Sequence, residues 1–176
     1  MIHYKSIDQS QFAEGTDIKE QERVFDDFLQ DTLLEIQGSH INKTNRIPHN
    51  VHISSQPDEK VPYIFLKTCN RSEIYYGEGE VPDEVARHLF RVVSGLESAI
   101  VGERAVQGQV KEAYYTAKAQ RPLTAELHRL FQSALQVGKR VRNETEISHG
   151  AVSHSLAALE IIESLGNVDL RNARIT

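Results

Sequence analysis

Apolar and polar positions follow different periods along the chain and predict strands first and helices later. Residues 2–7 alternate between apolar and polar side chains, which predicts a short strand. Asp17 and Glu20 then resemble a capping box, which predicts the start of a helix that ends near Gly38. The apolar stripe of this helix consists of Phe25, Phe28, Leu29, Leu33 and Ile36.

Two β-rich runs follow a polar stretch. Residues 39–60 are rich in Asn, Ser, Pro and His, which predicts a loop with a short strand, 51–55, inside it. Residues 61–67 are nearly all apolar and predict a buried strand. Residues 71–76 predict another strand, and the GEGEVPDE sequence after it is typical of a turn and a helix start.

Helical patterns occupy the chain after Pro82. We expect helices over 83–93, over 96–119, from Thr124, and from Gly150. The second of these ends before Arg121 and Pro122, because a proline disfavours helix at the residue before it. The last is apolar almost all round, and residues 170–176 become strand-like at their end. The whole pattern predicts an α+β fold, a small sheet with packed helices.

Composition narrows the class of protein. The 176 residues, 39% apolar and 26% charged, suit one folded domain or slightly more. No run of about 18 apolar residues predicts a membrane span, and no signal peptide is recognisable, so we expect a cytoplasmic protein. The single cysteine, Cys69, excludes an intrachain disulfide and a cysteine-based zinc cluster. His49 and His52 have no evident third ligand, so no metal is expected.

Charge is unevenly spread along the chain. Residues 1–60 hold 6 basic and 11 acidic side chains, whereas the remainder holds 14 of each. Between positions 121 and 142 the balance is basic, with only Glu126 acidic. This basic segment indicates either an anionic partner or an ordinary solvated helix face.

Two glycine pairs resemble phosphate-binding loops but lack their chemistry. Gly102 and Gly108 enclose five residues instead of four, and Gln109 stands where a phosphate loop needs lysine. Gly77 and Gly79 lack the third glycine of a dinucleotide fingerprint.

Cys69 lies in the sequence LKTCNRSEIYYG, between the two β-rich runs. Lys67 and Arg71 flank it, and cationic neighbours lower the pKa of a thiol. Thr68, Asn70 and Arg71 supply polar groups where a core position would favour apolar ones. A thiolate with adjacent donors suits covalent acyl transfer, although a cysteine at a strand end is also commonly a small buried apolar residue.

Three blocks together resemble the glutamyl-tRNA reductases, which begin tetrapyrrole synthesis from glutamate. They are LKTCNRSEIY at 66–75, HLFRVVSGLESAIVGERAVQGQVKEA at 88–113, and LFQSALQVGKRVRNETEISHGAVSHS at 130–155. The resemblance implies a catalytic domain over residues 1–149. It also implies the start of a spinal helix and linker over 150–176, leading to an NADPH-binding domain. Glutamyl-tRNA, a homodimer partner and glutamate-1-semialdehyde aminotransferase are the implied partners.

The resemblance also implies the site. Cys69 matches the family's nucleophile, which forms a thioester with the glutamyl group before NADPH reduces it to glutamate-1-semialdehyde. His88 matches its activity-linked histidine, expected to polarise the ester or carry a proton. The implied substrate positions are Thr68, Asn70, Arg71, Ser98, Glu103, Arg104, Ala105 and Gln109.

These positions suggest two pairings with groups of the substrate, and they include one departure from the family's usual residues. We expect Arg71 to bind the γ-carboxylate of the glutamyl group, and Glu103 its α-ammonium. Arg104 and Ala105 stand where the family usually has Pro and Gln. A side-chain contact made by that Gln is therefore not expected here, whereas a backbone contact is compatible with alanine.

Three functional hypotheses remain. The first is that this chain acts as the catalytic domain of a glutamyl-tRNA reductase. It is then expected to form the thioester but not to reduce it, because the NADPH-binding domain is not expected within these residues. A tRNA-binding module using the basic segment, and a cysteine-dependent hydrolase of aminoacyl esters, are the alternatives.

Overall fold

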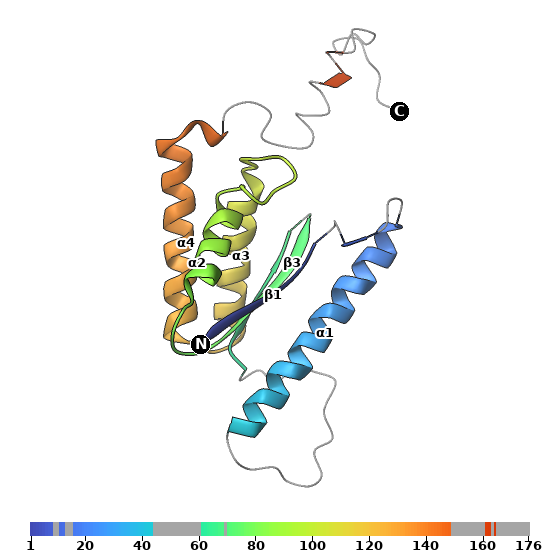
Figure 1. The fold of residues 1–176 in the computed structure, drawn as a ribbon, viewed down its shortest axis with the longest axis vertical. Coiled ribbons are helices and arrows are strands. Elements are labelled where there is room, and N and C mark those ends of the chain that lie inside the picture. The colour runs from blue at the N-terminus through green and yellow to red at the C-terminus, as the bar shows by residue number, and fades with distance from the viewer. Residues whose placement is uncertain are drawn as a thin grey trace.

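A computed structural model describes residues 1–8, 11–12, 16–43, 61–68, 70–148, 161–162 and 164. The described ranges form an α+β fold, a three-stranded antiparallel sheet packed between helices (Figure 1). In chain order the elements are β1 (Ile2–Asp8), α1 (Ile18–Lys43), β2 (Tyr63–Lys67), β3 (Arg71–Gly77), α2 (Asp83–Val93), α3 (Ala105–Gln120), α4 (Ala125–Glu144) and the short 3₁₀ helix η2 (Glu146–Ser148).

Strand β3 lies at the centre of the sheet, in the order β1-β3-β2, and pairs antiparallel with both neighbours. Its register places Glu73 opposite Ser6 of β1 and Leu66 of β2. Side chains alternate between the two faces of a strand, so Arg71, Glu73 and Tyr75 share one face. Arg71, the last residue of the LKTCNR block, thereby shares a face with a buried glutamate.

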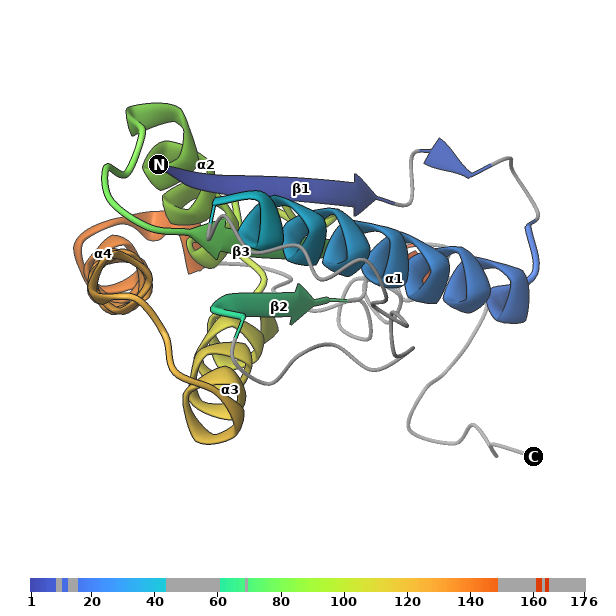
Figure 2. The same ribbon diagram turned by 90° about the horizontal axis from the view of Figure 1, so that it is seen from below.

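Helices cover both faces of the sheet. Helix α1 lies along one face, and α2, α3 and α4 gather on the other (Figures 1 and 2). The α1 side buries a small cluster: Leu33, Ile36, Val61, Tyr63 and Ile74. The opposite side buries the larger core, which joins Ile64, Leu66 and Tyr75 of the sheet to apolar residues of the three helices. Chemistry located on this larger side is therefore shielded from water.

Most of the predicted elements are confirmed. The predicted strands 2–7, 61–67 and 71–76 correspond to β1, β2 and β3, and the helix 83–93 is α2. The helix expected from Thr124 is α4, and Thr124 caps it by accepting a hydrogen bond from the Leu127 amide at 3.3 Å. The strand expected at 51–55 and the strand-like tail lie outside the described residues. Of the helix expected from Gly150, residues 161, 162 and 164 are described and are helical.

Two predicted helix boundaries are wrong. Helix α1 does not end at Gly38 but continues to Lys43, because one glycine costs a helix only about 1 kcal/mol and does not by itself end it. The helix expected over 96–119 begins only at Ala105. Gly95 and Gly102 have φ of 78° and 84°, outside the helical region, and the Gly102 amide donates to the Gly95 carbonyl at 3.0 Å. Residues 94–104 therefore form a closed loop between α2 and α3.

The loop conformation predicts a strong effect of Gly102→Ala. Gly102 has a left-handed φ, and an added Cβ would overlap the backbone carbonyl of Ile147 in η2. Strain and overlap together are expected to lower the free energy of unfolding by about 2–4 kcal/mol. Urea denaturation measures this change.

Gly108→Ala is the matched control. Gly108 lies in α3 with nothing within 4 Å of an added Cβ, so the alanine is expected to stabilise the helix by about 0.5–1 kcal/mol. Equal urea midpoints for the two variants would contradict the loop geometry.

Candidate active site

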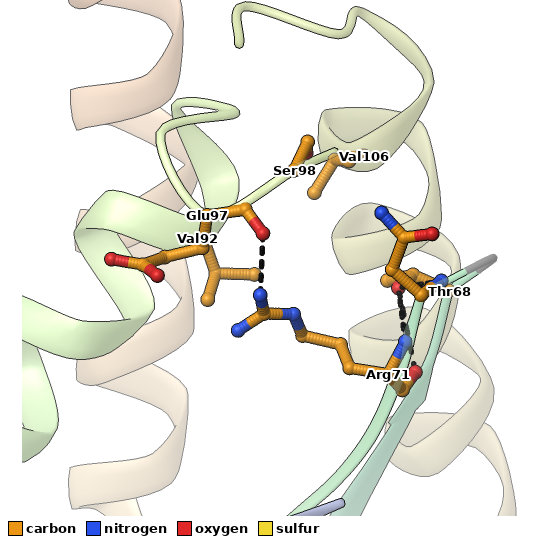
Figure 3. Close-up of a pocket in the computed structure, with 7 residues that line it drawn as sticks. Thr68, Arg71, Val92, Glu97, Ser98 and Val106 are labelled. Carbon is orange, nitrogen blue, oxygen red and sulfur yellow. Dashed lines mark hydrogen bonds between the residues drawn. The ribbon is translucent and has the colours of Figure 1, made fainter. Parts of the chain in front are cut away.

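A narrow cavity opens where the β2–β3 turn meets the loop 94–104. The centre of a water molecule can occupy about 10 Å³ of it, which is room for about one water, and its lining consists of Thr68, Asn70, Arg71, Val92, Glu97, Ser98 and Val106 (Figure 3). Four of these residues, Thr68, Asn70, Arg71 and Ser98, are substrate positions predicted from the sequence. Two segments separated by more than twenty residues in the chain thus contribute polar groups to one place.

Thr68 stabilises the turn between β2 and β3, which forms one end of the cavity. Its backbone amide donates to the Arg71 carbonyl at 2.9 Å, and its Oγ1 accepts from the amides of Asn70 and Arg71 at 3.3 and 3.2 Å. Side-chain acceptance of this kind is the usual way that threonine stabilises a tight turn. Cys69 lies between these residues in sequence, and its placement is outside the described residues.

Arg71 joins the sheet to the loop. Its Nη1 donates to Glu73 Oε1 at 3.3 Å, and its Nη2 donates to the backbone carbonyl of Glu97. Figure 3 shows the side chain extending from the strand toward that carbonyl, while the Glu97 carboxylate points away from it. Since a guanidinium has five N–H groups, these two bonds leave donors for a ligand in the cavity.

Glu73 is the functional candidate that the sequence analysis missed. Its side chain is completely buried, and it accepts hydrogen bonds from Tyr75 Oη at 2.6 Å and His88 Nε2 at 2.8 Å in addition to Arg71. A buried carboxylate is costly unless it is paired in this way. The signal that identifies it is the alternation of 71–77, which places Glu73 on the same face as the buried Tyr75.

His88 is held in one orientation by two contacts. Its ring stacks on Tyr4 of β1 with 4.3 Å between centroids and 15° between planes, and Nε2 faces the Glu73 carboxylate. A carboxylate only accepts hydrogen bonds, so Nε2 carries the proton of the neutral imidazole. Nδ1 is then the acceptor nitrogen of the ring, as in histidines that a carboxylate orients.

Tyr75 keeps its proton beside this carboxylate. Burial, followed by the charge and the hydrogen bond of Glu73, raises the pKa of the Tyr75 phenol well above its ordinary value of 10. The phenol therefore remains a hydrogen-bond donor to Glu73 throughout the physiological range.

The raised pKa of Tyr75 predicts a loss of stability in alkali. In the unfolded chain the phenol ionises near pH 10, whereas the folded chain retains the proton. Stability supplied by this group is therefore complete below pH 10 and declines as the pH rises through and above it. Urea denaturation at pH 8.5 and 10.5 should show a larger decrease for the wild type than for Tyr75→Phe, and equal decreases would contradict the assignment.

The remaining predicted positions do not line the cavity; they lie at the end of the loop 94–104 and in α3. Glu103 is buried at the end of the loop, Arg104 precedes α3, and Ala105 is the first residue of that helix. Gln109 lies one turn further along α3, and its buried Oε1 has no hydrogen-bond partner among the described residues. An orphaned buried acceptor is uncommon, and here it offers a place for a ligand donor.

The basic segment 121–142 is largely engaged within the protein. Arg121 lies over the Tyr63 ring at 3.7 Å from its centroid, and Arg140 pairs with Glu144 at 3.0 Å. Arg142 is half-buried and bonds to backbone carbonyls. Arg121 and Arg142 are therefore held by contacts within the chain, whereas Arg140 forms an exposed pair, and the tRNA-binding module stays an open alternative.

The described residues do not fit a nicotinamide dinucleotide. Their strands are antiparallel, and a Cβ on Gly77 would overlap the Met1 carbonyl, so the 77–79 turn accommodates β1 and not a pyrophosphate. Within the described part of the chain, no three His, Cys, Asp or Glu side chains gather closely enough to hold a metal ion. None of the helices in that part combines the length and apolar character of a membrane span.

Comparison with known proteins identifies the domain. Residues 78–145 match a sequence model of the family described as "Glutamyl-tRNAGlu reductase, N-terminal domain". A glutamyl-tRNA reductase of Thermus thermophilus is 41% identical over 118 residues, 56% of this chain and 30% of the relative. The chain contains a glutamyl-tRNA reductase N-terminal domain. The recognition made from the three sequence blocks is thereby confirmed.

The similarity to glutamyl-tRNA reductases extends over most of the chain. Glutamyl-tRNA reductase 2 of Anaeromyxobacter dehalogenans is 35% identical over 156 residues, which include 85% of this chain and 34% of the relative. The solved glutamyl-tRNA reductase of Methanopyrus kandleri is 39% identical, with a TM-score of 0.49 over 58% of this chain and 30% of that one. The chain spans about a third of the length of the curated relatives it matches.

Proposed function

We propose that this chain is the acyl-accepting part of a glutamyl-tRNA reductase, in which the Cys69 thiolate takes the glutamyl group from glutamyl-tRNA. The observation that carries the proposal is the cavity lined by Thr68, Asn70, Arg71 and Ser98. Two of these residues flank Cys69 in sequence. The pair formed by the partly exposed His88 and the buried Glu73 is bonded to Arg71 of the same cavity and supplies an oriented base.

The proposed acyl transfer requires one proton to move from the thiol to the leaving oxygen. The thiol of Cys69 gives its proton to Nδ1 of His88, and the resulting thiolate attacks the α-carbonyl carbon of the glutamyl ester. A sulfur–carbon bond forms and the ester carbon–oxygen bond breaks. The departing ribose oxygen takes the proton back from His88, whose transient positive charge is stabilised by Glu73 at 2.8 Å.

Two groups are placed to recognise the glutamyl moiety. The unused donors of Arg71 bind the γ-carboxylate, because a guanidinium matches a carboxylate with two parallel hydrogen bonds. The orphaned Oε1 of Gln109 accepts from the α-ammonium. Glu103 is the alternative acceptor proposed from the sequence, and its burial at the loop end places it next to the start of the same helix.

The reaction proposed for this chain stops at the thioester. Reduction to glutamate-1-semialdehyde requires the hydride of NADPH, and the described residues do not fit that cofactor. A homodimer and the aminotransferase partner stay predictions that follow from the resemblance, and a cytoplasmic location stays a prediction from the sequence.

Substrate discrimination tests the proposal. The chain is expected to deacylate glutamyl-tRNA at least about a hundredfold faster than the same tRNA charged with glutamine, whose neutral amide leaves Arg71 unpaired. Arg71→Gln should lose most of this preference, whereas Arg71→Lys should retain part of it. Equal rates for the two aminoacyl-tRNAs with the wild type would contradict the proposed substrate.

A further inference from the structure

Arg142, in the last turn of α4, makes an unusual set of contacts. Its Nη1 donates to Gln107 Oε1 at 2.8 Å and to the Gly138 carbonyl at 3.0 Å. Its Nη2 donates to the carbonyls of Val93 at 3.0 Å and Glu103 at 3.4 Å. One half-buried guanidinium thus joins α2, α3, α4 and the loop between α2 and α3.

These acceptors lie at the two ends of the loop 94–104. Val93 is the last residue of α2, and Glu103 is the penultimate residue of the loop. Because both carbonyls bind the same nitrogen, Arg142 fixes the separation of the loop ends. The planar fork of arginine suits this task better than the single ammonium of lysine.

Gly138 allows the contact to form. A Cβ at this position would lie 3.0 Å from Val93 Cγ2 and 3.2 Å from the Val93 carbonyl oxygen. The end of α2 therefore packs against the bare backbone of α4, which keeps the Val93 carbonyl within reach of Arg142.

The same loop provides one wall of the substrate cavity. Ser98 lines the cavity, and the Glu97 carbonyl receives a hydrogen bond from Arg71. Arg71 thus holds the middle of the loop to the sheet, while Arg142 holds its ends to α4.

We propose that Arg142 is a positioning residue that fixes the loop 94–104, and with it Ser98, against the substrate cavity. The inference rests on the proposed function for its effect on substrate, but the contact with the loop stands independently of it. Burial lowers the pKa of Arg142 relative to its ordinary value, in keeping with a group that is bonded inside the protein. Its role therefore differs from the phosphate contact suggested by the basic segment.

Amide exchange and kinetics on the same variants test this inference. Arg142→Ala is expected to accelerate hydrogen exchange in 94–104 while β3 remains protected. It should also lower kcat/KM for deacylation of glutamyl-tRNA by about ten- to a hundredfold, mainly through KM. The salt dependence of tRNA affinity should not change, whereas loss of a phosphate contact would reduce its slope by about one. Arg142→Lys should give an intermediate result.

The matched control is Arg140→Ala, which removes an exposed arginine of the same helix whose guanidinium pairs, among the described residues, with Glu144. It should leave loop exchange and kinetics unchanged. Gly138→Ala provides a second route, because it displaces Val93 without removing the guanidinium and should also accelerate exchange in 94–104.

Separate outcomes identify which part fails. Unchanged loop exchange in Arg142→Ala and Gly138→Ala would overturn the positioning role, as would faster exchange with unchanged KM. A wild-type chain that does not deacylate glutamyl-tRNA would overturn the proposed function, and loop exchange would still decide whether Arg142 fixes the loop.

Discussion

Cys69→Ser is expected to abolish transfer of the glutamyl group from glutamyl-tRNA while leaving the affinity for tRNA nearly unchanged. The serine hydroxyl has almost no anion at neutral pH, whereas Lys67 and Arg71 flank the thiol in sequence and should hold its pKa below about 8.5. Deacylation assays with radiolabelled glutamate measure the first effect, and filter binding of tRNA measures the second.

Alkylation of the thiol provides the control for this variant. The rate of reaction with iodoacetamide should reach half its maximum below the pH found for a free thiol. A half-maximum at or above that pH would remove the electrostatic argument, and undiminished deacylation by Cys69→Ser would remove covalent catalysis altogether.

Glu73→Gln is expected to lower the rate of acyl transfer by about a hundredfold or more. The amide cannot stabilise a positive charge on His88 as the carboxylate does, and it no longer fixes the proton on Nε2. Single-turnover deacylation of glutamyl-tRNA at neutral pH measures this loss.

Tyr75→Phe is the matched control for Glu73. It removes a different hydrogen bond to the same carboxylate and leaves the His88 contact in place. We expect a stability loss of about 1–3 kcal/mol with a rate within tenfold of the wild type. A rate loss in Tyr75→Phe as large as in Glu73→Gln would indicate that the cluster acts only as a structural support.

Elements with a regular period were predictable from the sequence. The alternation of 2–7, the β-rich run 71–76 and the threefold or fourfold spacing after Thr124 are local patterns that predict a strand or a helix directly. The α2–α3 loop was not predictable from the sequence, because its apolar residues Leu96, Ile100 and Val101 have helical spacing. What breaks that helix is the left-handed φ of Gly95 and Gly102, together with contact between Gly102 and the distant Ile147.

The family resemblance, rather than residue spacing alone, supplied the candidate site residues, and their roles stay predictions. Thr68, Asn70, Arg71 and Ser98 meet because an antiparallel hairpin and the loop after α2 end at the same edge of the fold. Glu73 and Arg142 were not assigned, since both are charged residues whose type suggests exposure. Their partners, His88 for Glu73 and Val93 for Arg142, lie 15 and 49 positions away and become neighbours only when the chain folds.

Intact-mass spectrometry of the wild-type chain mixed with glutamyl-tRNA, followed by peptide mapping, tests directly whether Cys69 accepts the glutamyl group. Acid quenching within the first turnover should preserve a glutamyl adduct carried by the peptide that contains Cys69, and Cys69→Ser should carry none. Deacylation of glutamyl-tRNA with no adduct at any quench time, or an adduct on another residue, would contradict covalent transfer of the glutamyl group to Cys69.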